Sequence, residues 1–185
     1  MRVLSLDKVL AGLAFLHRVR RFFENLRTSR KLVDDPRIDR YLSPAERTLF
    51  TGMPVPDQHH ALKVLSVLER AGHQEMALAR AALLHDIGKT RAGIRLWHRV
   101  LVVLLQSFAP GILMWLAGDG RPGWRYPWFA LVHHAARGAA LLEGTGSDPE
   151  TIFLVREHQT PLAQVNAQPE AKALLVALQA ADGTN

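Results

Sequence analysis

Histidine and aspartate recur along this chain at intervals that match the length of one helix. They stand in five short stretches, at residues 57–60, 85–89, 133–134, 157–158 and 181–183. The steps are 25 residues from His60 to His85, 48 from Asp86 to His134, then 24 to His158 and 24 to Asp182. About 24 residues make one ordinary helix, a turn and part of the next helix. The spacing therefore predicts that each candidate ligand comes from a different helix.

These side chains have the chemistry of a metal site without thiolates. The chain has no cysteine, so nitrogen and oxygen atoms must hold any ion. Adjacent His85 and Asp86 at a helix end can aim an imidazole nitrogen and a carboxylate oxygen at one ion. A mixed set of this kind suits Mn, Fe, Co, Ni or Zn. We therefore predict a centre for one or two divalent transition metals, held between packed helices.

The apolar periodicity predicts an all-α, single-domain protein. At 185 residues the chain is large enough for a real core. Ser43 and Glu46 form a capping box with Pro44 between them, which predicts that a short helix starts there, and Asp57 is expected to cap the next one. Helices are predicted at about 57–70, 74–86, 126–143, 149–159 and 168–182. No pattern typical of a strand is present.

The net charge of +6 belongs to the N-terminal segment. Residues 1–31 carry eight basic and two acidic side chains, and the rest of the chain is balanced. Apolar residues at helical spacing predict one amphipathic helix over residues 5–28. Three interpretations are open, namely a first helix packed on the body, a helix lying on an anionic membrane, and a contact with nucleic acid, which we do not expect. Residues 1–56 are thus interpreted as this helix and a linker.

The stretch 96–117 is strongly apolar, and Pro110-Gly111 interrupts it. Its length is close to that of a membrane span. A single crossing between Asp86 and His134 would put the candidate ligands on opposite sides of the membrane. We therefore expect a helical hairpin folded at Pro110-Gly111 that is buried or forms a lid. A hairpin that dips into one leaflet is the alternative, and it stays open because of Trp97, Trp115, Trp124 and Trp128 in and near the stretch.

Three motifs resemble the HD superfamily of metal-dependent phosphohydrolases. They are His60-Ala61-Leu62-Lys63-Val64, then Ala81-Ala82-Leu83-Leu84-His85-Asp86-Ile87-Gly88-Lys89, and finally Ala180-Ala181-Asp182. The run from His134 to Ala139, followed by Glu157-His158, is similar to the subset with a second metal. That subset includes cyclic-di-GMP phosphodiesterases and bacterial diadenosine tetraphosphatases. The resemblance covers residues 57–185 and implies an HD domain with an apolar insertion at about 90–125.

The resemblance also implies roles for single residues. One ion would be held by His60, His85, Asp86 and Asp182. A second would be held by His134 and His158, with Asp86 and a water bridging the two. Apart from the resemblance, the position of Lys89 just after the metal pair predicts that it acts with Asp86 in catalysis, and the positive charges of Lys89, Arg137 and Arg156 make them candidates for contact with the substrate phosphate. The chain has Gln159 where the cyclic-di-GMP enzymes have a second histidine, and it lacks their GYP signature.

The remaining histidines receive other interpretations. His59 is the alternative to His60 as first ligand. His133 is expected to pack beside the site, and surface or interface positions are expected for His17, His73 and His98.

These observations predict a cytoplasmic phosphohydrolase that attacks a nucleotide or other phosphate ester with metal-activated hydroxide. The reaction would be that of a phosphomonoesterase or a phosphodiesterase. Its partner would be a small molecule, with peripheral contact to an anionic membrane as an option. The alternative function is a noncatalytic metal-binding module for regulation or membrane docking.

Overall fold

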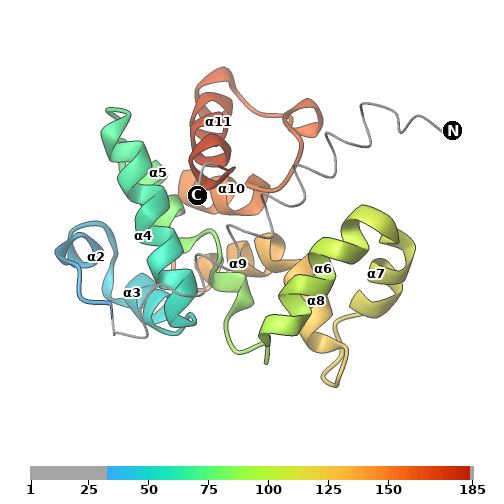
Figure 1. Cartoon of the computed structure of the whole chain (residues 1–185). Helices are drawn as coiled ribbons and strands as arrows, with labels where there is room; N and C mark the ends of the chain where they lie inside the picture. Colours follow the sequence, from blue (N-terminus) through green and yellow to red (C-terminus); the bar gives the residue numbers. More distant parts are fainter. Residues whose placement is uncertain (1–32, 184–185) are drawn as a thin grey trace, which may run out of the picture.

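A computed structural model describes residues 33–183, and every regular element in this range is helical (Figure 1). This confirms the predicted all-α class. The helix predicted over residues 5–28 lies outside the described residues. Contact with a membrane stays a prediction.

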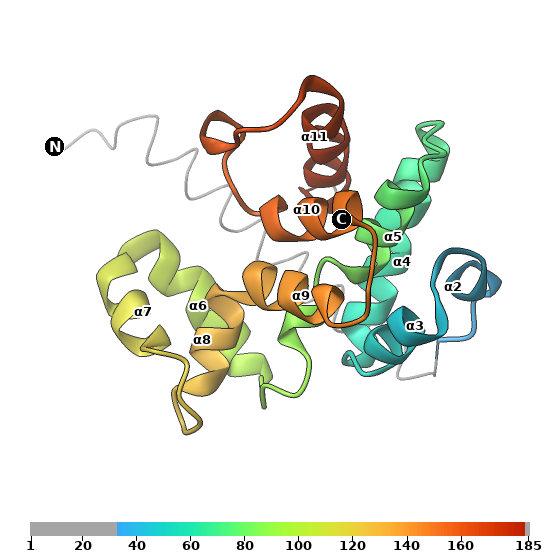
Figure 2. The same cartoon turned by 180° about the vertical axis from the view of Figure 1, so that it is seen from behind.

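The core is built around α5 (Met76–Leu84), which is apolar on nearly all sides. A helix of this kind must be covered all round. It contacts α4 (Val55–Arg70), α10 (Pro149–Glu157) and α11 (Pro169–Gly183), whose side chains complete one buried cluster (Figures 1 and 2). The C-terminal end of this buried helix delivers His85 and Asp86 to the interior.

Two short helices cover another side of α5. They are α2 (Pro36–Tyr41) and α3 (Pro44–Thr51), and the predicted capping box of Ser43 and Glu46 is present at the start of α3. Ile38 and Phe50 are buried in the core cluster. The described part of the predicted linker is therefore part of the packed body.

Asp57 does not cap α4, contrary to the prediction. The helix begins two residues earlier, at Val55, after Pro54. Asp57 is buried on the first turn and accepts two hydrogen bonds from the Arg99 guanidinium, both of 2.6 Å. An arginine fork satisfies both oxygens of a carboxylate at once, so the buried pair ties α4 to α6 (Leu96–Phe108).

A second group of helices lies beside the core (Figures 1 and 2). In it α6 contacts α7 (Pro110–Ala117), and both contact α8 (Tyr126–Val132). The predicted helix over 126–143 is broken at His133, whose backbone leaves the helical conformation. The break separates α8 from α9 (His134–Glu143), which contacts α10 and the short 3₁₀ helix η1 (Ile87–Lys89). A second 3₁₀ helix, η2 (Leu162–Gln164), precedes α11.

The apolar stretch 96–117 forms α6 and α7, which meet at Ala109. No helix within residues 33–183 is long and apolar enough to cross a membrane. The fully buried form of the predicted hairpin is not seen, because seven of its large apolar side chains are exposed, including Phe108 at 76% and Trp115 at 62%. The lid form stays a prediction. These two helices lie against α8 and contribute no side chain to the core cluster.

His98 on α6 is buried, so the surface position, one of the two predicted for it, is wrong. Its ring stacks on Trp97 at 3.7 Å between centroids and meets the ring of Trp128 edge-on. The Arg95 backbone N–H donates to its Nδ1. Burial lowers the pKa of His98, which keeps the ring neutral between the two indoles.

The ion pair between α4 and α6 gives a test of this packing. Asp57→Ala removes the carboxylate and leaves the mostly buried Arg99 guanidinium without its partner. We expect a loss of about 3 kcal/mol in the free energy of unfolding, measured from the urea midpoint.

The control is Asp39→Ala, which removes a pair between Asp39 and Arg47 whose side chains are 61% and 56% exposed. That change should stay within about 0.5 kcal/mol of the parent. Equal losses in the two variants would contradict a structural role for the pair of Asp57 and Arg99.

Candidate metal centre

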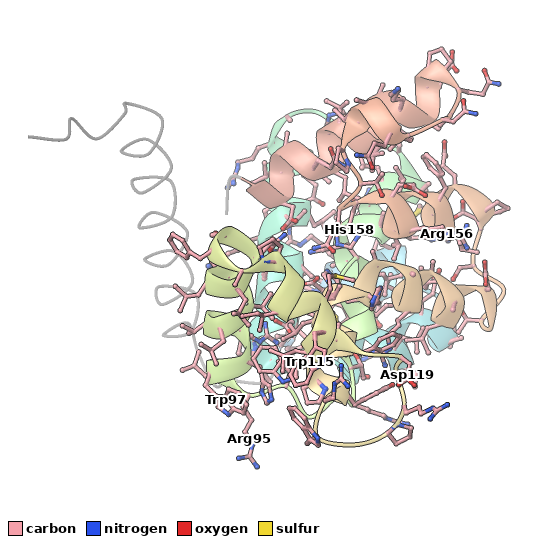
Figure 3. All side chains as sticks on the ribbon, turned by 90° about the vertical axis from the view of Figure 1, so that its right-hand side faces the viewer. Arg95, Trp97, Trp115, Asp119, Arg156 and His158 are labelled. Carbon is pink, nitrogen blue, oxygen red and sulfur yellow. The ribbon has the colours of Figure 1, made fainter. Side chains whose placement is uncertain are left out.

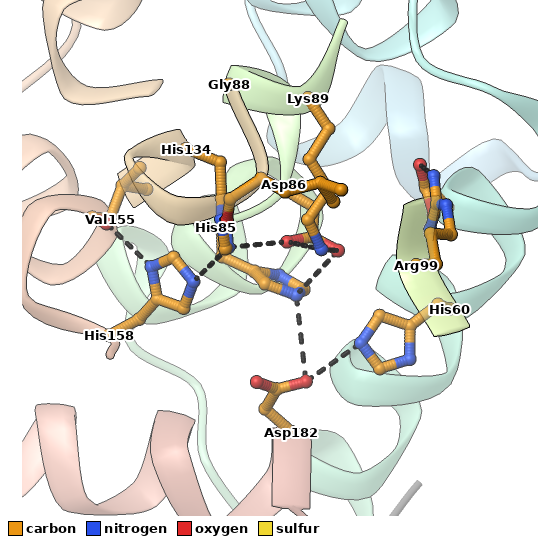
Figure 4. A network of polar contacts seen from close by, with 12 residues as sticks. His60, His85, Asp86, Gly88, Lys89, Arg99, His134, Val155, His158 and Asp182 are labelled. Carbon is orange, nitrogen blue, oxygen red and sulfur yellow. Dashed lines mark hydrogen bonds and ion pairs between the residues drawn. The ribbon is translucent and has the colours of Figure 1, made fainter. Parts of the chain in front are cut away.

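The six predicted ligands converge from different helices on one place in the interior (Figure 4). His60 comes from α4, and His85 and Asp86 follow α5. His134 starts α9 and His158 ends α10, while Asp182 lies in the last turn of α11. The prediction that each stretch comes from a different helix is confirmed.

Their ligand atoms form two groups that share Asp86. One group is His60, His85 and Asp86, and the other is Asp86, His134 and His158. Within each group the ligand atoms lie within 4.8 Å of one another. Asp182 joins the first group, with its Oδ1 at 2.8 Å from His60 Nε2 and 3.8 Å from His85 Nε2. These buried groups can hold a metal ion.

Three of the imidazoles are oriented in the same way. Each donates its Nδ1–H to the carbonyl three residues earlier, at 3.0 Å for His85, 2.8 Å for His134 and 2.7 Å for His158. Each ring follows the last turn of a helix, where carbonyls lack an intrahelical partner. Because a carbonyl only accepts, Nδ1 carries the proton in all three rings. Nε2 is then unprotonated, and its lone electron pair points into the cluster.

Such free electron pairs face one another in the second group. His134 Nε2 lies 3.2 Å from His158 Nε2 and 3.3 Å from Asp86 Oδ1. Burial lowers the pKa of His134, and burial together with the His85 and His134 rings lowers the pKa of His158 to about 3. Both rings are thus neutral at neutral pH, and three acceptors meet with no hydrogen between them.

A cation would turn this unfavourable contact into a favourable one. Two nitrogens 3.2 Å apart subtend about 100° at an ion with the usual metal–nitrogen length of about 2.1 Å. In the first group, His85 Nε2 is buried and has no hydrogen-bond partner among the described residues. Buried polar atoms without a partner are rare and point to a missing ligand. The donor set therefore fits a transition metal.

Both carboxylates are ionised. Burial alone would raise the pKa of Asp86, but the Lys89 ammonium holds it well below its usual range. Lys89 Nζ lies 2.7 Å from each Asp86 oxygen. Burial likewise opposes ionisation of Asp182, and the hydrogen bond from His60 outweighs it and lowers that pKa. The same hydrogen bond raises the pKa of His60 against the effect of burial.

Gly88 allows the two groups to share Asp86. A Cβ atom placed on Gly88 would lie 1.9 Å from the carbonyl oxygen of His134, so any side chain there would push α9 away. Gly138 faces it, and a Cβ on Gly138 would meet the Gly88 nitrogen at 3.4 Å. The backbone of η1 therefore lies directly against α9, next to His134. Neither glycine was predicted to have a role, because nothing in the sequence shows that the two lie opposite each other.

The predicted phosphate-binding arginines lie elsewhere. Arg137 donates to the Gly88 carbonyl and to Tyr126 Oη, so it holds η1 against α9. Arg156 is 45% exposed, pairs with Glu143 and lies apart from His158 (Figure 3). Of the three basic residues proposed for phosphate, Lys89 alone belongs to the cluster.

Of the histidines within residues 33–183 left open by the sequence, His60 belongs to the cluster and the others lie outside it. His60 lies in the cluster, and His59 lines a different hollow with Arg37 and Lys63. His133 packs on Phe129 at 4.6 Å between ring centroids, in agreement with the predicted packed position. His73 bonds to Glu75 near the surface.

Comparisons with protein-family models, with curated proteins and with solved structures find no match to this chain. A functional assignment therefore depends on the chemistry of the cluster itself.

Metal binding should be measurable directly. Protein loaded with Mn²⁺ or Zn²⁺ at 100 times the dissociation constant should gain about 2.7 kcal/mol of stability. For a chain of this length, that gain raises the melting temperature by roughly 5–10 °C, and a chelator should reverse the shift.

His134→Ala should lower the bound metal by one ion per chain in elemental analysis. The neighbouring variant His133→Ala is the control and should keep full metal content.

The close approach at Gly88 gives a second test. Gly88→Ala should displace α9, cost about 3 kcal/mol and reduce metal affinity, because His134 moves away from Asp86. Gly111→Ala is the control, since a Cβ there meets nothing within 4 Å. Stability and metal affinity would be compared by urea unfolding and metal titration. A Gly88→Ala variant with normal metal affinity would show that the contact does not set the distance between the groups.

Proposed function

We propose that this protein is a phosphohydrolase that uses two divalent transition metals bridged by Asp86. The observation that carries the proposal is the second ligand group, in which His134, His158 and Asp86 direct acceptor atoms at one point. The first group, His60, His85 and Asp86 with Asp182, would hold the other ion. The ions would be Mn, Fe, Co, Ni or Zn, since the ligands are imidazoles and carboxylates.

Two such ions lower the pKa of a water between them and neutralise the oxygens of a phosphoryl group. Asp86 would hold the pair together and keep the centre low in charge. Hydrolysis joins the water oxygen to phosphorus and breaks the bond from phosphorus to the ester oxygen. The alcohol then leaves with the proton, and no further reactant is needed. The residues around the cluster supply orientation and charge for this step.

Lys89 is the side chain best placed to contact substrate. Its ammonium lies at the edge of the cluster, and it also lines the pocket next to it. With metal ions on Asp86, the carboxylate would interact less with Lys89. The ammonium could then turn to a phosphate oxygen or to the leaving oxygen, as a compact, mobile point charge does.

The order of the ligands and the motif around His85 and Asp86 support membership of the HD superfamily, as the sequence resemblance implies. The rival function is a noncatalytic metal-binding module. A pocket that opens beside the cluster favours the enzyme, because a structural metal site is closed to other ligands. The experiment that separates them is hydrolysis of p-nitrophenyl phosphate and bis(p-nitrophenyl) phosphate by metal-loaded protein.

Two variants give the proposal its sharpest test. Asp86→Ala should abolish hydrolysis and leave helix content unchanged in circular dichroism. Lys89→Ala should lower kcat/KM about 10- to 100-fold, the value of a hydrogen bond to a charged group, with bound metal unchanged.

Lys172→Ala is the matched control, because Lys172 bonds to the Val165 carbonyl away from the cluster. It should behave as the parent protein. A Lys89→Ala variant as active as the parent would remove Lys89 from the mechanism. A metal-loaded parent protein that hydrolyses neither ester would leave the noncatalytic module as the function.

A further inference from the structure

A pocket of about 370 Å³ lies between the metal centre and the second group of helices. Two of its lining residues, Lys89 and His134, belong to the cluster described above. Its volume is at the lower end of the range for sites that enclose small molecules. A phosphate at the metal centre would therefore have the rest of its molecule in or near this pocket.

The walls of this pocket are aliphatic. Two valines from α6 and two large side chains from α7 face residues of α8 across it. The apolar lining residues are these six, Val102, Val103, Leu113, Met114, Leu131 and Val132, together with Pro110. The polar ones away from the cluster are Gln106, Gln159 and Arg99, and Asp57 already neutralises Arg99.

Among residues 33–183, the lining of this pocket includes no Phe, Tyr, Trp, Asp or Glu, and its one aromatic ring, that of His134, belongs to the cluster. Proteins that bind a nucleobase usually stack it on an aromatic ring and bind its polar edge. An aliphatic chain needs neither and gains from leaving water. The walls therefore fit a hydrocarbon better than a base.

We propose that the substrate is an amphiphilic phosphate ester, with its phosphate at the metal centre and an aliphatic chain in this pocket. The inference rests on the proposed phosphohydrolase function and specifies its substrate class. It also accounts for the apolar stretch 96–117, which the metal centre does not need and the core does not bury. The inner faces of α6 and α7 would hold the chain of the substrate.

The test is a series of straight-chain alkyl phosphates from methyl to octyl, each below its micelle-forming concentration, with adenosine 5′-monophosphate beside them. With metal-loaded protein, kcat/KM should rise by about fourfold for each methylene buried, until the pocket is full. Octyl phosphate should be a better substrate than the nucleotide. Calorimetry should show, independently of turnover, that octylphosphonate binds more tightly than methylphosphonate.

Two neighbouring residues of α7 form a matched pair of variants. Met114 and Ile112 are each 54% exposed, and of the two Met114 alone lines the pocket. Met114→Gln should lower the octyl-to-methyl ratio of kcat/KM about tenfold. Ile112→Gln should leave this ratio unchanged. The ratio is insensitive to partial loss of folded protein, because both substrates report on the same sample.

A second arm distinguishes a dissolved ester from a membrane lipid. The same variants would be tested on a long-chain alkyl phosphate incorporated into phosphatidylcholine vesicles. If the protein extracts its substrate from a bilayer, vesicle hydrolysis should exceed that of dissolved octyl phosphate, and Ile112→Gln should reduce the vesicle reaction alone. If the substrate is soluble, the dissolved ester should be preferred and Ile112→Gln should affect neither reaction.

The outcomes separate the two proposals. Equal kcat/KM for methyl and octyl phosphate, or a preference for the nucleotide over octyl phosphate, would overturn the aliphatic substrate and leave the phosphohydrolase in place. Failure to hydrolyse any ester with metal bound would overturn the phosphohydrolase, and the substrate class with it.

Discussion

Three imidazoles of the metal centre are held by hydrogen bonds from Nδ1 to carbonyls at the ends of helices. A helix always leaves its last carbonyls free, so a histidine just after the last turn can satisfy one of them. The same bond fixes the tautomer and directs Nε2 inward. The same local hydrogen bond therefore orients His85, His134 and His158 as candidate ligands. Asp86 can then lie between two groups of donors, and both the metal chemistry and the proposed hydrolysis depend on this arrangement.

Packing brings these locally defined rings to one point. The buried α5 carries His85 and Asp86 into the interior, and the backbone of η1 approaches α9 where Gly88 and Gly138 lack side chains. The ion pair of Asp57 and Arg99 joins the core to α6 at the edge of the pocket. The candidate metal centre and the apolar pocket are thus connected through packed helices. Hydrolysis of the phosphate ester and binding of its aliphatic chain would take place at adjoining sites.

Much of this arrangement follows from helical spacing and capping patterns that can be seen in the sequence. Helical spacing predicted which helices carry the ligands, and the capping box predicted the start of α3. Features set by contacts between distant elements were not predictable in this way. Asp57 has the pattern of an N-cap, and its actual partner Arg99 lies 42 residues away. His133 interrupts a continuous helical pattern, and apolar composition alone could not show that α6 and α7 form a pocket wall with exposed outer faces.

The central claim is that the two donor groups around Asp86 hold two ions. Anomalous diffraction from crystals of Mn²⁺-loaded protein, recorded above and below the metal edge, tests it directly. The account predicts two peaks about 4 Å apart, one beside His134 and His158 and one beside His60 and His85, with Asp86 between them. A single peak would reduce the centre to one ion. No peak at either group would contradict the account.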